Sequence, residues 1–333
     1  MITEIVTELP LVPAEMREKI LSAPRTSEAH RALFDQTEAM HRVQTGGAAC
    51  AEVLATPMTI AAWNVERCLF PQETADKLRT EGASIVLLSE VDHGMARTGQ
   101  RHTTREVAER LGMVYVFGVE FFELGLGSPT ERAFCTETEN ARGWHGNAIL
   151  SAVPFNRVAL VRLDCHGHWF STEFGADPGQ PRIGGRMALL AEVATDHGPL
   201  CVVSTHLESN ANAAHRAAQA GRLMDAIDVF APGLPVVIGG DLNTGNHMPP
   251  DFDWRSETLF QTARERGYHW DGTADGMTTR PSLITRHPDR TMKLDWFACR
   301  GLAAVSPRIV SSMAGEVPLS DHDMIVMTCM PVE

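Results

Sequence analysis

The stretch Leu234–Gly245, LPVVIGGDLNTG, runs from an apolar segment through two glycines into a pair of polar residues. Its Val and Ile residues predict a short buried strand, because β-branched side chains suit the pleated backbone. The glycines end the strand, so Asp241 and Asn243 fall at its carboxyl end. Such strand ends form binding sites in α/β folds, although an Asp-x-Asn step is also typical of an ordinary turn.

The same arrangement, an apolar run that ends in polar side chains, recurs along the chain. The residues at these ends are Asn64, Glu90, His206, Asp241, Asn243, Asp295, Asp321 and His322. The repetition predicts that they converge on one site. Most of their donors are hard oxygens, and no thiolate or H-E-x-x-H helix accompanies them, so Mg²⁺ or Mn²⁺ fits better than structural zinc, with Ca²⁺ as an alternative.

The composition limits the classes of function. With 44% hydrophobic and 21% charged residues, the chain of 333 residues resembles an ordinary soluble globular protein. A formal charge of −13 argues against a broad nucleic-acid-binding surface, which needs clustered Lys and Arg. The sequence contains no apolar run long enough for a transmembrane segment, no classical signal peptide and no C-x-x-C pair. We therefore expect a cytoplasmic protein.

Short apolar runs alternate with helical stretches from residue 58 to residue 333, which predicts a catalytic α/β domain with a mixed sheet or two packed sheets. Helices are expected at about 72–81, 102–111, 211–230 and 257–266. Residues 1–57 are expected to form a helical extension. Within it, the apolar spacing over 26–43 predicts an amphipathic helix that packs on the main body or on a second copy of the chain, giving a homo-oligomer.

Seven segments of the chain resemble, in order, the motifs of the endonuclease/exonuclease/phosphatase superfamily. They are WNV at Asn64, LLSEVD at Glu90, HGNAILS at Asn147, STHLES at His206, GGDLNT at Asp241, LDWFAC at Asp295 and LSDHDM at His322. The resemblance covers about residues 58–330. It implies a four-layered α/β sandwich, in which two mixed β-sheets lie face to face, helices flank them, and the site lies at one rim.

The resemblance also implies a metal site and a hydrolytic mechanism. Glu90 would be the main metal ligand, with Asn64 beside it and Asp321 completing or supporting the site. Asp241 would orient and deprotonate the attacking water. Asn243 would hydrogen-bond the phosphoryl group or that water.

Two histidines complete the implied catalytic set. His322 would bind a non-bridging phosphoryl oxygen, with Asp295 holding the other nitrogen of its ring. His206 would contact the phosphate or help to protonate the leaving oxygen. Imidazole, carboxylate and metal together supply the three needs of phosphodiester hydrolysis: a positioned water, neutralised charge and a protonated leaving group.

Three further residues are predicted to bind substrate. His145 stands where many relatives carry a tyrosine, and it precedes Asn147 in the G-N-A motif. Arg186 begins a strand after two glycines, where its guanidinium could reach a phosphate, but a surface ion pair explains it equally well.

The function predicted from the sequence is a metal-dependent phosphoesterase that hydrolyses a small or lipid-derived phosphodiester. The alternative is a nuclease acting on short or single-stranded nucleic acid. A protein that kept the fold and lost the chemistry is disfavoured, because Glu90, Asp241, Asp321 and His322 are all present. A metal site working on a non-phosphate substrate remains open, since a fold alone does not specify chemistry.

Overall fold

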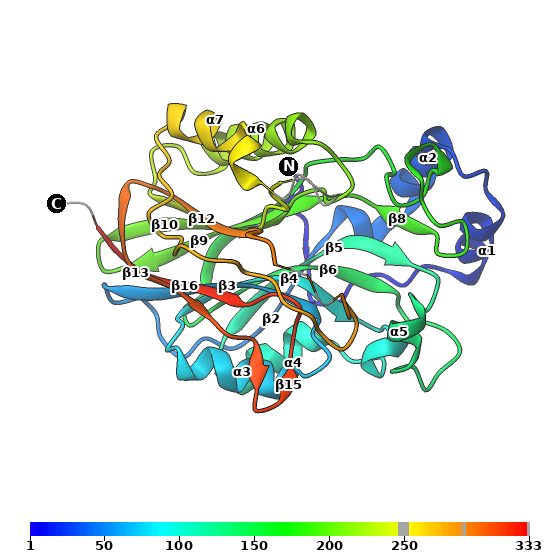
Figure 1. Ribbon diagram of the computed structural model, residues 1–333, viewed down its shortest axis with the longest axis horizontal. Coiled ribbons are helices and arrows are strands. Elements are labelled where there is room, and N and C mark those ends of the chain that lie inside the picture. Colours follow the sequence, from blue (N-terminus) through cyan, green and yellow to red (C-terminus); the bar gives the residue numbers. More distant parts are fainter. Residues whose placement is uncertain (246–252, 288, 290, 332–333) are drawn as a thin grey trace.

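Two β-sheets lie face to face in the computed structural model, which describes residues 1–245, 253–287, 289 and 291–331 (Figure 1). The larger sheet contains, in spatial order, β1 (Ile5–Val6), β2 (Val43–Gly47), β5 (Val114–Glu123), β6 (Trp144–Ser151), β4 (Ile85–His93), β3 (Met58–Arg67), β16 (Met324–Pro331) and β13 (Leu302–Val310), with β8 (Arg182–Gly184) paired to β5. The smaller sheet contains β12 (Asp295–Arg300), β11 (Val236–Asp241), β10 (Gly198–His206), β9 (Met187–Thr195) and β7 (Phe155–Arg162). A separate hairpin joins β14 (Met313–Ala314) to β15 (Val317–Pro318).

Helices flank the two sheets on their outer faces and at one end (Figure 1). They are α1 (Ala14–Ser22), α2 (Ser27–Gln36), α3 (Pro71–Thr80), α4 (Thr103–Leu111), α5 (Pro129–Arg132), α6 (Ala213–Phe230) and α7 (Leu259–Glu265), with short 3₁₀ turns η1 (Glu38–His41), η2 (Ala96–Thr98), η3 (Thr172–Phe174) and η4 (Trp254–Ser256). Helices α6 and α7 lie over the smaller sheet, and α3 and α4 lie over the larger one (Figure 1). The predicted four-layered sandwich of mixed sheets is confirmed. None of the described helices is both long and apolar enough to cross a membrane.

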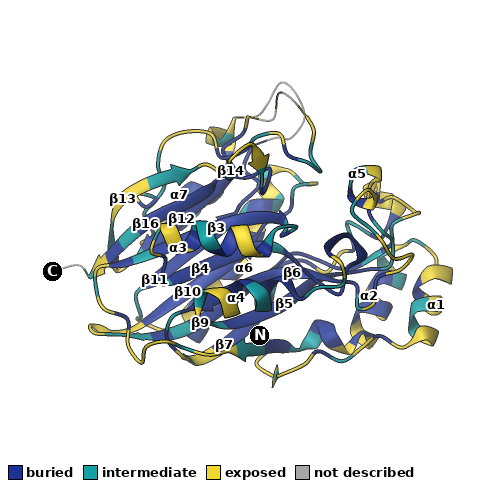
Figure 2. Cartoon of the chain, turned by 90° about the horizontal axis from the view of Figure 1, so that it is seen from below, coloured by how far each residue is buried: buried dark blue, intermediate teal, exposed yellow. Residues whose placement is uncertain are grey.

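The central strands are apolar on both faces because each face packs on a different layer. In β4, Leu87 belongs to the core between the sheets, whereas Leu88 belongs to the core that includes residues of α3 and α4. Both side chains are fully buried, and the strands appear as a dark blue centre in Figure 2. Complete burial of a leucine side chain contributes about 1.5–3 kcal/mol. The uninterrupted apolar runs in the sequence follow from this double burial.

The two glycines of the GGD segment allow close packing around β11. A Cβ atom at Gly239 would lie 2.7 Å from Leu87 Cδ1 of the facing sheet. A Cβ atom at Gly240 would clash with the carbonyl oxygen of Thr205 on the neighbouring strand, and Gly240 has a φ of +148°. Glycine relieves both conflicts. Asp241 is thereby placed in register with His206 on β10 and Asp295 on β12.

Irregular backbone at the ends of β3 and β4 turns their polar residues toward the same rim. The pairing of β4 with β6 shifts register between Leu88 and Val91, and Glu90 within this interval has a left-handed φ of 58°. The pairing of β3 with β4 shifts just after Asn64. Such bulges re-aim side chains, and here they separate Glu90 from the alternating pattern of its strand.

The N-terminal segment contributes strands as well as helices. The helix predicted over 26–43 ends at Gln36, because Thr37 leaves the helical conformation with φ of −90° and ψ of 92° and the chain then enters η1 and β2. Leu33 and Phe34 of α2 are buried in this chain's own core. Strand β2 pairs with β5 of the larger sheet. The boundary at residue 57 and the homo-oligomer stay predictions.

Candidate active site

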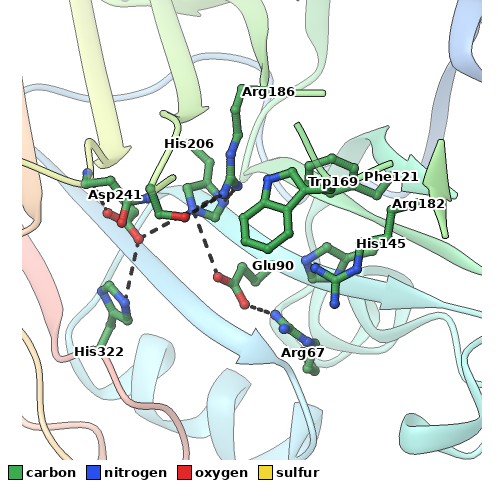
Figure 3. A pocket seen from close by; sticks show the side chains of 12 residues that line it. Arg67, Glu90, Phe121, His145, Trp169, Arg182, Arg186, His206, Asp241 and His322 are labelled. Atoms are coloured by element: carbon green, nitrogen blue, oxygen red, sulfur yellow. Dashed lines mark hydrogen bonds and ion pairs between the residues drawn. The ribbon is translucent and has the colours of Figure 1, made fainter. Parts of the chain in front are cut away.

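A cavity of about 190 Å³ opens at the rim where the strand ends meet (Figure 3). Its lining consists of Arg67, Glu90, Phe121, His145, Trp169, Arg182, Arg186, His206, Ser209, Asp241, Asn243 and His322. Most of the residues predicted from the strand ends are therefore in one place, and both sheets contribute to it.

Asn64 joins the two carboxylates at the centre of the site. Its side-chain nitrogen donates to Glu90 Oε1 at 3.0 Å and to Asp241 Oδ2 at 3.1 Å. Its side-chain oxygen accepts the backbone N–H of Glu66 at 3.1 Å, which fixes the orientation of the amide. A single buried amide thus brings a carboxylate from each sheet to face the same point.

His322 is held between two aspartates. Its Nδ1 lies 2.8 Å from Asp295 Oδ2, and its Nε2 lies 3.6 Å from Asp241 Oδ2 (Figure 3 shows the second contact). Burial by itself would lower the pKa of His322, but the negative charges of Asp295, Asp321 and Asp241 raise it to about 10. The ring is therefore an imidazolium near neutral pH, and it donates to Asp295 through Nδ1.

Asp241 is the complementary anion. Burial would raise its pKa, but the charges of His322 and His206 lower it, as do hydrogen bonds from Asn243 N and the Asn64 side chain. Asn243 has a φ of 48°, and its backbone N–H donates to Asp241 Oδ1 at 2.8 Å. Its side-chain nitrogen donates to the Leu207 carbonyl at 2.9 Å. The Asp241–Asn243 segment therefore forms a tight turn and also contributes side chains to the site, so the turn and the binding-site interpretations both apply.

Arg186 places a fixed positive charge beside His206. Its Nη1 lies 2.9 Å from His206 Nδ1 and 3.1 Å from Glu120 Oε1, and its Nε lies 3.3 Å from Glu208 Oε2. Burial would lower the pKa of Arg186, but Glu120 and Glu208 raise it. For the acid Glu120 burial has the opposite effect and would raise the pKa, but the charges of Arg186 and His206 lower it to about 2. The alternative that Arg186 forms a surface ion pair is wrong, because Arg186 and its partners Glu120 and Glu208 are buried.

The donor set suits a hard divalent cation. Glu90 directs Oε1 toward Asn64 and lies 4.0 Å from His206 Nε2, while its Oε2 pairs with Arg67. The Asp321 backbone N–H donates to Glu66 Oε2 at 3.2 Å, and burial followed by the charge of Asp321 raises the pKa of Glu66 to about 7. Asp241, Asp295 and His322 also lie within 4.8 Å of one another, but a protonated His322 has no lone pair for a metal, so that group is better described as an ion-paired set. Carboxylate oxygens such as those of Glu90 are the donors that Mg²⁺ and Mn²⁺ prefer.

The family model described as Endonuclease/Exonuclease/phosphatase family matches residues 61–322. The chain belongs to this family. No curated protein matches the chain. Members of the family are generally phosphoesterase hydrolases that depend on a divalent metal.

Solved structures share the family fold at low sequence identity. A family protein from Beutenbergia cavernae DSM 12333 is 19% identical, with a TM-score of 0.56 over 82% of this chain and 71% of that one. A protein of the family from Bacteroides vulgatus is 14% identical, with a TM-score of 0.56 over 83% and 99%. The human Nocturnin catalytic domain with bound sulfate is 17% identical, with a TM-score of 0.56 over 87% and 97%. These likenesses concern the fold alone.

Of the predicted substrate-binding residues, His145 lines the cavity and Asn147 is buried outside the described lining. His145 lines the cavity, and its Nδ1 lies 2.8 Å from Asp92 Oδ1. Burial lowers the pKa of His145, with a further contribution from Arg67. Asn147 is fully buried, donates to the Met187 carbonyl at 3.4 Å and is outside the described cavity lining. A role for Asn147 in substrate binding stays a prediction.

Sequence reasoning from the family motifs missed part of the cavity wall. The missed residues are Arg67, Phe121, Trp169, Arg182 and Ser209. Ser209 is the last residue of the STHLES segment but was given no role there, whereas Arg67 stands two positions beyond the WNV segment, so a longer motif window would have included it. Trp169 lies in a loop without periodic pattern, and no local signal marks it.

Behind Arg67, charged side chains form what we call the buried ion-pair chain: Glu90, Arg67, Glu131, Arg97 and Asp92. Arg67 pairs with Glu90 and, through Nε, with Glu131 Oε1 at 2.9 Å. Arg97 continues the chain to Glu131 at 2.9 Å and to Asp92 Oδ2 at 2.8 Å. The Asp92 carboxylate then holds His145, so two walls of the family's cavity are linked by charge.

Proposed function

We propose that this chain is a metal-dependent phosphodiesterase that hydrolyses a small, polar phosphodiester. The observation that carries the proposal is the buried contact between Asp241 and His322, whose Nε2 lies 3.6 Å from Asp241 Oδ2. Their mutual charges lower the pKa of Asp241 and help to raise that of His322. This pair supplies a base and a charged donor at one point, which is what attack of water on a phosphoryl group requires.

Each step has a residue suited to it. Asp241 Oδ2 accepts the proton of the attacking water as the new P–O bond forms. The Nε2–H of His322 donates to a phosphoryl oxygen and stabilises the charge that develops there, while Asp295 keeps the ring in place. A divalent cation held by Glu90 and Asp321 would polarise the phosphoryl group and lower the pKa of the water, with Asn64 holding the Glu90 carboxylate through its amide nitrogen. As the P–O bond to the leaving group breaks, His206, whose ring contacts Arg186, would donate a proton to the departing oxygen.

The cavity favours a small polar substrate over a lipid. Its volume is about 190 Å³, and Phe121 and Trp169 are the large apolar residues in its described lining. A lipid tail needs a continuous apolar surface, whereas polar groups that fix the orientation of a small ligand dominate here. Arg182 and Arg186 could meet a second polar or anionic group of the substrate beside the scissile phosphate.

The test is hydrolysis of bis-p-nitrophenyl phosphate and p-nitrophenyl phosphate by metal-stripped protein, with Mg²⁺, Mn²⁺ or Ca²⁺ restored in turn. We expect metal-dependent release from the diester that His322→Ala abolishes. His197→Ala is the matched control, because the side chain of His197 is 58% exposed and pairs with the surface residue Asp196. Release from the diester that His322→Ala leaves intact would refute the proposal.

A nuclease is the second candidate, and Trp169 favours it. Its ring lines the cavity and could stack on a nucleobase, a contact that tolerates any sequence. A single-stranded oligonucleotide assayed at rising salt separates the two candidates. Rates that fall steeply with salt would indicate several phosphate contacts and a nuclease, whereas a small diester binds with weak salt dependence.

A further inference from the structure

A second cluster of metal-binding side chains lies outside the candidate active site. It consists of Asp164 and His168, from the loop that follows β7, and His215, from the first turn of α6. One ligand atom from each of these residues lies within 4.8 Å of the others. The cluster joins a loop to a helix, so it is assembled only in the folded chain.

The contacts within the cluster are unequal in length. Asp164 Oδ2 lies 2.7 Å from His215 Nε2 and 3.3 Å from His168 Nδ1. The side chain of His168 is only 10% exposed, and its Nδ1 meets Asp164 at a distance longer than an ordinary hydrogen bond. A cation bound by both atoms would give this nitrogen a stronger partner than the carboxylate alone.

Neighbouring groups hold the three side chains in place. The backbone N–H of His166 donates to Asp164 Oδ1 at 2.8 Å, which leaves Oδ2 facing the two rings. The His168 ring stacks on Phe174 with 4.3 Å between centroids. Asn212 caps α6 by accepting from the backbone N–H of His215 at 3.0 Å. Ligands oriented by such outer contacts are typical of metal sites.

We propose that Asp164, His168 and His215 bind a transition metal ion of the Zn²⁺ class. Two imidazoles and one carboxylate suit Zn²⁺ or Co²⁺, whereas Mg²⁺ prefers oxygen ligands throughout. In a tetrahedral zinc site neighbouring donor atoms are about 3.3 Å apart. The observed separations of 2.7 and 3.3 Å are close to that value and need only a small widening.

The cluster also has an open side and a connection to the active site. A cavity of about 350 Å³ is lined by His168, Trp169, Arg182 and Asn210 among others, which gives a metal ion a route from solvent. Trp169, next to His168 in the chain, lines the catalytic cavity as well, and its Nε1 donates to Glu208 at 3.2 Å. The metal would therefore fix the loop that carries Trp169, whatever substrate the active site accepts.

An ordinary hydrogen-bonded cluster is the competing explanation. It accounts for the contact between Asp164 and His215 and for the longer contact between Asp164 and His168. A cation bound by all three residues would replace both contacts, and zinc binding separates the two explanations.

The test is a zinc titration of metal-stripped protein by calorimetry, with saturating Mg²⁺ present to occupy the oxygen-rich active site. We expect His168→Ala and His215→Ala each to bind one zinc equivalent fewer than the unchanged chain, or to bind it at least about 100-fold more weakly. His197→Ala, at an exposed histidine that also contacts an aspartate, should bind as the unchanged chain does. Equal zinc binding by all four proteins would overturn the proposal.

A measurement on a chain with an intact cluster covers the case in which those variants fail to fold. X-ray absorption of a His206→Ala/His322→Ala protein loaded with one zinc equivalent reports the ligands directly, because His145 is then the one imidazole left in the described lining of the catalytic cavity. Two imidazole ligands on the zinc would support the cluster. One imidazole or none would contradict it.

Discussion

Glu90 has a partner on each of its carboxylate oxygens, Asn64 on one and Arg67 on the other. In Glu90→Gln the hydrogen bond to Asn64 can be kept while the negative charge is lost. We expect the metal-dependent rate to fall by more than about 100-fold, because changing a metal ligand costs more than changing the residues behind it. Rates and metal affinity are measured across a Mg²⁺ titration.

Glu81→Gln is the control for that experiment. Glu81 and Glu90 have side chains that are each 19% exposed, and Glu81 pairs with Arg308 away from the cavity. The control should keep the rate. A Glu90→Gln protein that melts normally and turns over at the rate of the control would remove Glu90 from the metal site.

His322 makes stability depend on pH in the metal-free protein. Its pKa is raised from the ordinary 6.5 to about 10, so the folded state binds a proton more tightly than the unfolded state does. The resulting stabilisation is complete below pH 6.5 and is lost as the pH rises through about 10. Asp295→Asn removes the nearest negative charge and should move this loss to lower pH. Urea unfolding at several pH values measures it, and identical pH profiles for both proteins would contradict the assignment.

The sequence predicted the residues at the centre of the candidate active site better than those that line the rest of its cavity. Asp241 and His206 end apolar strands, so a short local pattern marks them. Trp169 and Arg182 reach the cavity from loop and short-strand positions that depend on how distant segments dock. The sequence predicted a role for Arg186 but not its burial. That burial depends on Glu120 and Glu208, which two other segments of the chain place beside it.

Among the elements, β11 depends most directly on its glycines. Gly240→Ala would place a methyl group against the Thr205 carbonyl at a φ of +148°, so we expect a loss of about 1–3 kcal/mol in the free energy of unfolding. Gly221→Ala is the control, since Gly221 lies within α6 with nothing within 4 Å of its Cβ position. That change should stabilise the helix by up to about 1 kcal/mol. Urea midpoints that shift in the same direction for both variants would contradict the argument.

Helices with a clear periodic pattern in the sequence were predicted close to their observed bounds, whereas edge strands carry a weaker pattern. The helices expected at 72–81 and 211–230 match α3 and α6 to within two residues at each end. Strand β13 has no clear strand pattern in the sequence, because it lies at a sheet edge, contains Pro307 and is interrupted by a register shift between Val305 and Arg308. Strand β7, also at an edge, begins with polar and exposed residues.

For the whole molecule, the N-terminal segment should unfold together with the rest of the chain. Phe34 of α2 is only 5% exposed and belongs to the same core as the larger sheet. Phe34→Ala should therefore lower the stability of the entire chain by about 3–5 kcal/mol in a single transition. Differential scanning calorimetry measures this, with Leu21→Ala as the control because Leu21 is 55% exposed. A separate low-temperature transition in Phe34→Ala would show instead that the segment folds on its own.

The buried ion-pair chain has a consequence for attempts to redesign the specificity of this cavity. Removing one member, for example Arg97 at 1% side-chain exposure, leaves the buried Asp92 without its arginine, while Glu131 keeps Arg67. Breaking a buried ion pair in this way costs about 3–5 kcal/mol, so single substitutions at Arg67, Arg97 or Glu131 would lower the stability of the chain before they changed its activity. Mutant libraries for this wall should exchange oppositely charged residues in pairs, or be confined to Phe121, Trp169 and Ser209, which are outside that chain.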